Sequence, residues 1–149
     1  MYKRILVGTD GSGTSGAALR EALRLAAGPQ AQLKIVNVID SPYAYADAWY
    51  TALSVDADAV RGAWRRAGEE ILARAAAAAR DAGVDAETAV VERDGRRISR
   101  ALVDEGERWS AEMIVLGSHG AQAQEGLYLG SVAEGVARAA RVPVLLVRG

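Results

Sequence analysis

The sequence contains no cysteine and only one histidine, His119. The absence of cysteine excludes disulfides, thiol catalysis and cysteine–zinc sites, and a single histidine excludes a metal site built from several histidines. No apolar run approaches the roughly 18 residues of a membrane-spanning helix. The first residues, MYKRILVGTD, lack the form of a secretion signal. We therefore expect a cytoplasmic protein with no membrane partner.

A large excess of one charge is also missing, since 18 basic and 19 acidic residues give a formal net charge of −1. This balance argues against a nucleic acid as partner, although it is compatible with a local phosphate pocket. The 149 residues are half hydrophobic and one quarter charged, which is typical of a soluble globular protein. That length predicts a single domain over residues 1–149.

Short apolar runs alternate with helical patterns along the chain. Strands are predicted at residues 5–8, 33–40, 86–93, 113–117 and 143–147. Helices are predicted between Ser12 and the Gly28-Pro29 stop and at residues 56–82, 96–109 and 131–141. The strict order β-α-β-α-β-α-β-α-β predicts an α/β fold: a doubly wound, mainly parallel, Rossmann-like sheet of five strands with helices on both faces.

Apolar residues at helical spacing predict the inner faces of three of these helices. They are Leu19, Ala22, Leu23 and Ala26 in the first, Ile98, Ala101 and Leu102 in the third, and Val132, Val136, Ala139 and Ala140 in the last.

Glycines, hydroxyls and acids follow three of the predicted strands. The first strand leads into Gly8-Thr9-Asp10-Gly11-Ser12-Gly13, the second ends in Val38-Ile39-Asp40, and the fourth leads into Gly117-Ser118-His119-Gly120. Ligands of doubly wound sheets bind beyond the carboxyl ends of the strands, where the strand order reverses. We therefore expect a polar crevice at this edge of the sheet.

The segment GSHGAQAQEGLYLGS, residues 117–131, predicts an anion site. Glycines allow the main chain to approach a ligand, and successive amides in such a turn form an anion-binding concavity. Gly130-Ser131 at a helix start adds unpaired amides and the positive end of the helix dipole. Two such arcs that face one crevice suit a polyphosphate, to which the hydroxyl of Ser131 could also bind.

Structural interpretations of the same residues stay open. Gly117 and Gly120 also suit a tight exit from a strand, and Ser131 with Glu134 fits a capping box. His119 also suits a hydrogen bond within the loop, and Asp10 also suits the cap of the following helix. The sequence lacks both the G-x-G-x-x-G spacing and the P-loop pattern, which disfavours hydride transfer and a P-loop NTPase.

The spacing Gly117-x2-Gly120-x9-Gly130-Ser131 resembles the nucleotide-binding signature of the universal stress protein family, G-x2-G-x9-G-(S/T). The stretches ILVGTDGS, MIVLGSHG and LGSVAEGVARAARVPVLLVR are also similar to that family, so the resemblance covers the whole chain. It implies a sheet of strand order 3-2-1-4-5, an adenine nucleotide between strands 1 and 4, and a role as a sensor or regulator of the stress response.

The resemblance also implies a cofactor and a partner. The nucleotide would be ATP, with AMP or cyclic AMP as alternatives, and Mg²⁺ or Mn²⁺ would be carried by its phosphates. A homodimer would form through the last strand, Val144–Val147.

By matching positions, the resemblance implies a role for each site residue. Asp10 would contact the ribose or adenine end, and Gly8, Thr9, the Val38 backbone and Leu116 would line the base pocket. The phosphates and ribose would be held by Gly117, His119, Gly120, Gly130, Ser131 and Val132. It implies no catalytic residue and no protein ligand to a metal.

The spacer of the signature, AQAQEGLYL, departs from the family because it contains no Arg or Lys and one acid, Glu125. An acid near a triphosphate weakens binding unless it points away or binds the metal, which disfavours ATP relative to AMP. A second variable stretch, residues 41–55, contains Tyr43, Tyr45, Trp49 and Tyr50. These aromatic residues suit stacking on adenine, closure over the site, or packing in a surface groove.

Two other functions remain open. A slow ATPase would need groups that position water and stabilise the transferred phosphoryl group, and only His119 and Glu125 offer acid–base chemistry near this loop. A dimeric interaction protein with an empty site is the other alternative, and the intact glycine–serine pattern argues against it.

Overall fold

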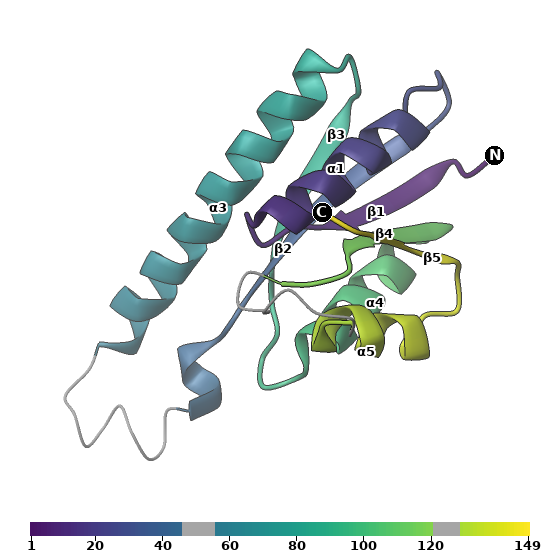
Figure 1. Ribbon diagram of the computed structural model, residues 1–149. Coiled ribbons are helices and arrows are strands. Elements are labelled where there is room, and N and C mark those ends of the chain that lie inside the picture. Colours follow the sequence, from purple (N-terminus) through teal and green to yellow (C-terminus); the bar gives the residue numbers. More distant parts are fainter. Residues whose placement is uncertain (46–55, 121–128) are drawn as a thin grey trace.

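The computed structural model describes residues 1–45, 56–120 and 129–149 (Figure 1). Trp49 and Tyr50 of the aromatic stretch lie outside the described residues, and so does Glu125 of the signature spacer. The hypotheses for these side chains therefore remain predictions from the sequence.

Five parallel strands form one sheet in the order β3-β2-β1-β4-β5, as expected. The strands are β1 (Arg4–Gly8), β2 (Gln32–Ile39), β3 (Ala86–Glu92), β4 (Met113–Gly117) and β5 (Val144–Val147). Val7 of the central strand β1 pairs with Ile35 of β2 on one side and with Val115 of β4 on the other. The strand order reverses between β1 and β4, which places a ligand crevice at the carboxyl ends of these two strands.

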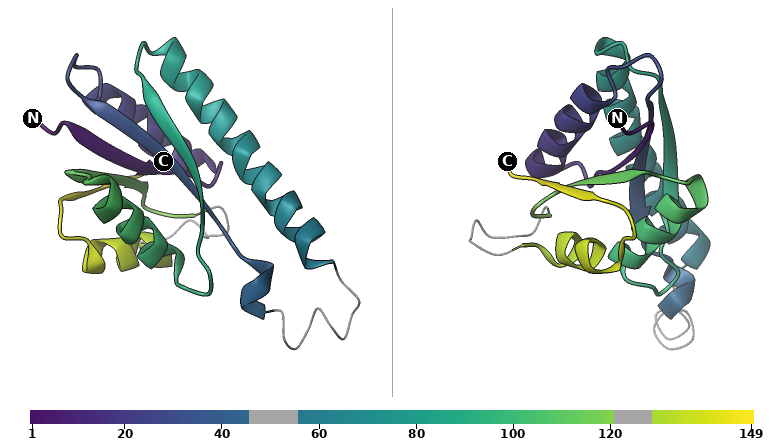
Figure 2. Two further views of the ribbon diagram at one scale, coloured as in Figure 1. Left: turned by 180° about the vertical axis from the view of Figure 1, so that it is seen from behind. Right: turned by 90° about the vertical axis from the view of Figure 1, so that its right-hand side faces the viewer.

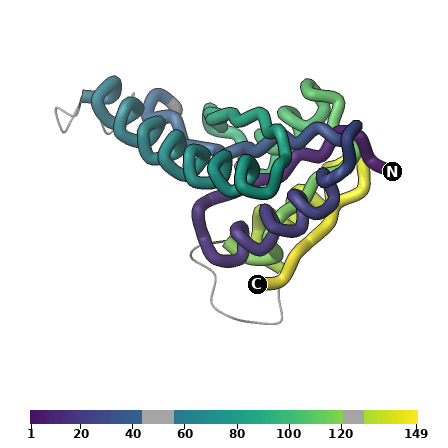
Figure 3. The backbone as a smooth tube through the Cα atoms, turned by 90° about the horizontal axis from the view of Figure 1, so that it is seen from above, coloured from purple at the N-terminus to yellow at the C-terminus, as the bar shows by residue number. Residues whose placement is uncertain are grey.

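Helices cover both faces of the sheet. Helices α1 (Gly13–Leu25) and α3 (Ala57–Asp81) lie on one face, where Figure 3 shows them side by side. Helices α4 (Ile98–Trp109) and α5 (Ser131–Ala139) pack together on the other face (Figure 2). Among the residues that the structure describes, no helix is both long and apolar enough to cross a membrane.

Each face of the sheet has its own apolar core. Ile5 and Val7 of β1 point toward α1 and α3, whereas Leu6 points toward α4 and α5. This alternation explains why β1 is apolar from Ile5 to Val7, since a strand that is covered on both faces has no solvent-facing positions there. The predicted inner faces of α1, α4 and α5 all contribute to these two cores.

The element boundaries differ from the predicted ones by at most two residues, with the largest differences at the start of α4 and the end of α5. The capping-box hypothesis for Ser131 and Glu134 is wrong, because Gly130 is the N-cap of α5 and Glu134 pairs with Arg138 at 2.6 Å. Within the stretch predicted as a loop, residues Pro42–Tyr45 form a short 3-10 helix, η1, near the start of α3 (Figure 1).

The cap of α1 is Ser12, whose side chain accepts a hydrogen bond from the amide of Ser15. The alternative that Asp10 caps this helix is therefore wrong. Asp10 instead uses Oδ1 to accept a hydrogen bond from the amide of Ser12 at 2.9 Å. Its carboxylate orders the turn before the helix.

Candidate functional site

A cavity of about 540 Å³ opens at the carboxyl ends of β1, β2 and β4. Its wall includes all eleven residues that the sequence pointed to: Gly8, Thr9, Asp10, Val38, Leu116, Gly117, His119, Gly120, Gly130, Ser131 and Val132. Six further wall residues were not predicted: Ser15, Val36, Asn37, Ile98, Leu102 and Ala133. The structure therefore brings five separate segments of the chain to one hollow, at the reversal of the strand order.

One side of the cavity is apolar. It is formed by side chains from β2, α4, β4 and α5: Val36, Val38, Ile98, Leu102, Leu116 and Val132. Such a surface suits a flat heterocycle that excludes water from both partners. Helical spacing predicted Ile98 and Leu102 only as core residues. In the structure they pack in the core and also line the cavity, because the first turns of α4 border it.

The turn after β1 is held by hydrogen bonds at every polar group of Thr9. Its amide donates to the carbonyl of Val36 at 2.9 Å, and its Oγ1 lies 3.1 Å from Ser15 Oγ. The same Oγ1 accepts from the amide of Gly11, while the carbonyl of Thr9 accepts from Asn37 Nδ2 at 2.8 Å. Gly11 has a φ of 80°, a conformation that favours glycine. The turn is therefore rigid before any ligand arrives.

Asp10 lies at the mouth of the cavity, between the turn after β1 and the turn after β4. Its Oδ1 is held by the amide of Ser12, and its Oδ2 lies 3.5 Å from the position that a Cβ atom on Gly120 would occupy. A carboxylate at this point suits the hydroxyls of a sugar, because it only accepts hydrogen bonds and hydroxyls donate them.

The turn after β4 closes tightly onto the start of α5. The amide of Gly130 donates to the carbonyl of Ser118 at 2.8 Å, and a Cβ atom on Gly130 would lie 3.3 Å from both that carbonyl and His119 Cα. Because the N-cap is a glycine, no side chain caps the first amides of α5. These amides and the helix dipole suit an anion, with exposed Ser131 beside them.

Two residues of this turn also have structural partners. A Cβ atom on Gly117 would lie 3.0 Å from the main chain of Thr14, so this glycine allows β4 to pack closely against α1. The Nδ1 atom of His119 lies 2.8 Å from Ser118 Oγ. Both observations support the structural interpretations of these residues, and neither removes the residues from the cavity wall.

The charges of the cavity are few. Its described wall contains one carboxylate, Asp10, and neither lysine nor arginine. Positive potential therefore comes from main-chain amides and the dipole of α5. No group of three acids or histidines among the described residues is placed to hold a metal ion. The Mg²⁺ or Mn²⁺ expected from the sequence stays a prediction.

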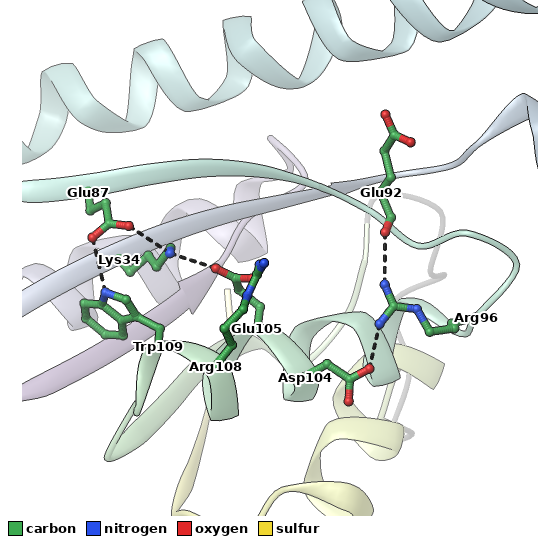
Figure 4. A network of polar contacts seen from close by, with 8 residues as sticks. All are labelled: Lys34, Glu87, Glu92, Arg96, Asp104, Glu105, Arg108 and Trp109. Atoms are coloured by element: carbon green, nitrogen blue, oxygen red, sulfur yellow. Dashed lines mark hydrogen bonds and ion pairs between the residues drawn. The ribbon is translucent and has the colours of Figure 1, made fainter.

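A second cavity, of about 460 Å³, lies along β3 and α4, and Figure 4 shows part of the polar network beside it. Most of its charged groups pair with one another, as in Arg96 with Asp104 at 2.6 Å and Arg65 with Glu92 at 3.2 Å. Nearby, the buried Lys34 joins Glu105 at 2.7 Å and Glu87 at 2.8 Å, and this hydrogen-bonded ammonium lowers the pKa of Glu87. This network ties α4 to β2 and β3, so the first cavity is the candidate site.

Comparisons with known proteins point to one family. A family model described as the universal stress protein family matches residues 1–148. The universal stress protein YxiE of Bacillus subtilis strain 168 is 30% identical over 151 residues, which cover 99% of this chain and 100% of that protein.

Solved structures extend the same match. A protein of the universal stress protein family from Burkholderia pseudomallei is 33% identical, with a TM-score of 0.77 and coverage of 98% of this chain and 96% of that one. A universal stress protein in complex with cAMP is 31% identical, with a TM-score of 0.71 and coverage of 98% and 97%. Matches of this length include the strands and helices that form the cavity.

Proposed function

The chain belongs to the universal stress protein family, and we propose that it binds an adenine nucleotide in the cavity between β1 and β4. One observation carries the proposal: the two glycine turns and the start of α5 converge on a single hollow whose other side is apolar. A nucleotide has the same division, with a flat apolar base at one end and an anion at the other. The similar universal stress protein that was solved with cAMP supports this choice of ligand.

The wall residues take roles according to their chemistry. Val38, Ile98 and Leu116 contact the base, and Asp10 accepts hydrogen bonds from the ribose hydroxyls. The amides at Gly120 and at the first turn of α5 bind phosphate, together with the hydroxyl of Ser131. His119 borders the phosphate end.

ATP is the form of nucleotide that we propose from the sequence, with Mg²⁺ or Mn²⁺ held by its phosphates. AMP and cyclic AMP are the alternatives, because the described wall of the cavity provides no cationic side chain to neutralise a triphosphate. The proposed biological role is a stress-response sensor or regulator, whose contacts with partners depend on the bound nucleotide.

A homodimer through β5 is part of the proposal. This strand is at one end of the sheet, and Val144–Val147 are all half-buried apolar residues. Exposed apolar edges favour pairing with a second copy.

Isothermal titration calorimetry with Mg·ATP, AMP and cyclic AMP tests the ligand, with GMP as the control for the base. We expect one adenine nucleotide to bind per chain and GMP to bind at least about tenfold more weakly, a difference of ~1.4 kcal/mol. Single-turnover incubation with ATP tests for hydrolysis in the same samples. Absence of binding by all three adenine nucleotides, or equal binding of GMP and AMP, would contradict the proposal.

A further inference from the structure

Asn37 is a buried amide in a strand that is otherwise mostly apolar. It lies in β2 with 5% of its surface exposed, and its Nδ2 donates to the carbonyl of Thr9 at 2.8 Å. A buried amide destabilises a protein unless it is hydrogen-bonded, so this contact explains how the residue is tolerated. It does not explain why β2 has an amide here, since an apolar side chain would suit the core as well.

The contact fixes one peptide plane at the cavity. The carbonyl of Thr9 and the amide of Asp10 belong to the same planar peptide group, so holding the carbonyl also sets the direction from which the Asp10 side chain starts. The other polar groups of Thr9 are held by Val36, Ser15 and Gly11. Asn37 supplies the bond that completes the set.

Helix α3 supports Asn37 from the other side. A Cβ atom on Gly68 of this helix would lie 2.7 Å from Asn37 Oδ1, closer than two such atoms can approach. A glycine at this position leaves room for the amide, and only its Nδ2 end can donate to Thr9. The orientation of the amide therefore depends on α3, although α3 contributes no residue to the described wall of the cavity.

We propose that Asn37 is a positioning residue for nucleotide binding: it orients the Thr9–Asp10 peptide, and thereby the carboxylate that accepts from the ribose, while Gly68 leaves the room that its amide needs. This inference rests on the proposed function of the cavity. It gives α3 a connection to the ligand through Gly68 and Asn37.

A double-mutant cycle separates positioning from a general loss of structure. Asn37→Leu keeps a similar volume and removes the donor. Calorimetry first finds which of Mg·ATP, AMP and cyclic AMP binds the wild type most tightly, and the Kd for that nucleotide is then measured for every variant. If Asn37 acts through Asp10, the substitution weakens binding about tenfold in the wild-type background and less than about twofold in an Asp10→Ala background.

Gly68→Ala provides a second route that leaves Asn37 itself unchanged. The new methyl displaces the amide, so we expect the same pattern, with weaker binding that depends on Asp10. Gly62→Ala is the matched control, because a Cβ atom there would meet only the side chain of Arg66 in the same helix. This control should bind like the wild type.

Two results would overturn the inference while the proposed function stands. One is unchanged affinity in both folded Asn37→Leu and Gly68→Ala, and the other is an equal loss with and without Asp10, which indicates a structural role only. Failure of the wild type to bind any of the three nucleotides would instead overturn the proposed function, and the inference with it.

Discussion

Because Gly130 has no side chain, the turn after β4 can approach the start of α5 closely. A Cβ atom at this position would lie 3.3 Å from the carbonyl oxygen of Ser118, a contact that side chains rarely make. The residue also donates its amide to that carbonyl, so it cannot move away without breaking the bond. The geometry of the proposed phosphate cradle therefore depends on this glycine.

We expect Gly130→Val to abolish the rise in melting temperature that nucleotide causes in the wild type, because the side chain pushes the turn after β4 away from α5. Thermal denaturation with and without 1 mM AMP or Mg·ATP, a concentration about 1,000 times a micromolar Kd, measures this. Gly13→Val is the control, since among the described residues nothing outside its own helix and its chain neighbours lies within 4 Å of a Cβ atom there. A rise that survives Gly130→Val would place the nucleotide elsewhere.

Glu92 gives the stability of the protein a dependence on pH. Its carboxylate accepts hydrogen bonds from Arg61 and Arg65 of α3, and the Arg61 bond in particular lowers the pKa of Glu92. Because the folded-state pKa lies below the unfolded value of about 4.3, the stabilisation is complete above that value and is lost as the pH falls through the folded-state pKa.

Glu92→Gln should therefore lower the melting temperature by a few degrees at pH 7 and by much less at pH 3. Calorimetric scans of both proteins at several pH values between these limits test this. Glu70→Gln, at an exposed position of α3, serves as the control and should change little at either pH. An equal difference at pH 7 and pH 3 would mean that the ion pair makes no contribution.

At the scale of elements, α4 and α5 approach each other through a glycine. A Cβ atom on Gly135 in the middle of α5 would lie 2.4 Å from Ser99 Oγ on α4. Glycine is a poor helix former, and replacement by alanine usually favours a helix by about 1 kcal/mol. Close packing reverses that preference here.

We expect Gly135→Ala to destabilise the protein by about 1–3 kcal/mol, the usual cost of overpacking a core. Urea denaturation measures the free energy of unfolding. The double variant Gly135→Ala with Ser99→Gly should recover part of the loss, because the second change removes the atoms with which the methyl collides. A Gly135→Ala protein that is more stable than the wild type would show that the two helices can separate at no cost.

The elements themselves could be predicted because their periodicity is strong. The continuous apolar run of β1 and the spacing of Leu19, Ala22 and Leu23 reflect local rules that the sheet and α1 both obey. The residue that caps a helix could not be predicted in the same way, because several neighbouring groups can satisfy the same amides. Asp10 and Ser12 both suit a cap, and only the tertiary path of the turn selects Ser12.

The candidate site was predictable in part: Val38, Leu116 and Val132 of its apolar side were named from the sequence, whereas Ile98 and Leu102 were not. Glycines after β4 indicate an anion, because few other roles need main chain without side chains. The apolar side depends on where α4 crosses the sheet, which no local pattern of Ile98 or Leu102 encodes. Asn37 is visible in the sequence as an amide within the run Ile35–Ile39, which is otherwise apolar, but its partner Thr9 is 28 positions away.

At the scale of the molecule, positive and negative charges nearly balance, but the cavity wall differs from this average. Among its described residues it has only one charged side chain, an acid. A triphosphate bound there must be neutralised by amides and by a metal that its own phosphates carry.

We expect removal of Mg²⁺ by EDTA to weaken ATP binding about tenfold or more, and AMP binding less than about twofold. Calorimetry with and without the metal checks this. Equal affinity for ATP in both conditions would indicate cationic groups that we have not assigned to the site.

In the proposed homodimer, the two copies pair through the edge strand β5. The carbonyls of Pro143 and Val147 accept hydrogen bonds from the amides of Ile114 and Ser118. Alternate residues of a strand direct their main-chain groups to opposite sides, so Val144 and Leu146 point theirs away from β4. These outward groups are the ones that a second copy would pair with.

Leu146→Pro removes an outward amide without breaking a bond to β4, and we expect it to convert the proposed dimer into a monomer. Size-exclusion chromatography with light scattering measures the molar mass of the protein in solution. Leu146→Ala is the matched control: it loses similar apolar contacts but keeps the amide, and should weaken the dimer less. A Leu146→Pro protein that remains a dimer would show that the copies associate through another surface, and a wild-type protein that is monomeric would contradict the homodimer itself.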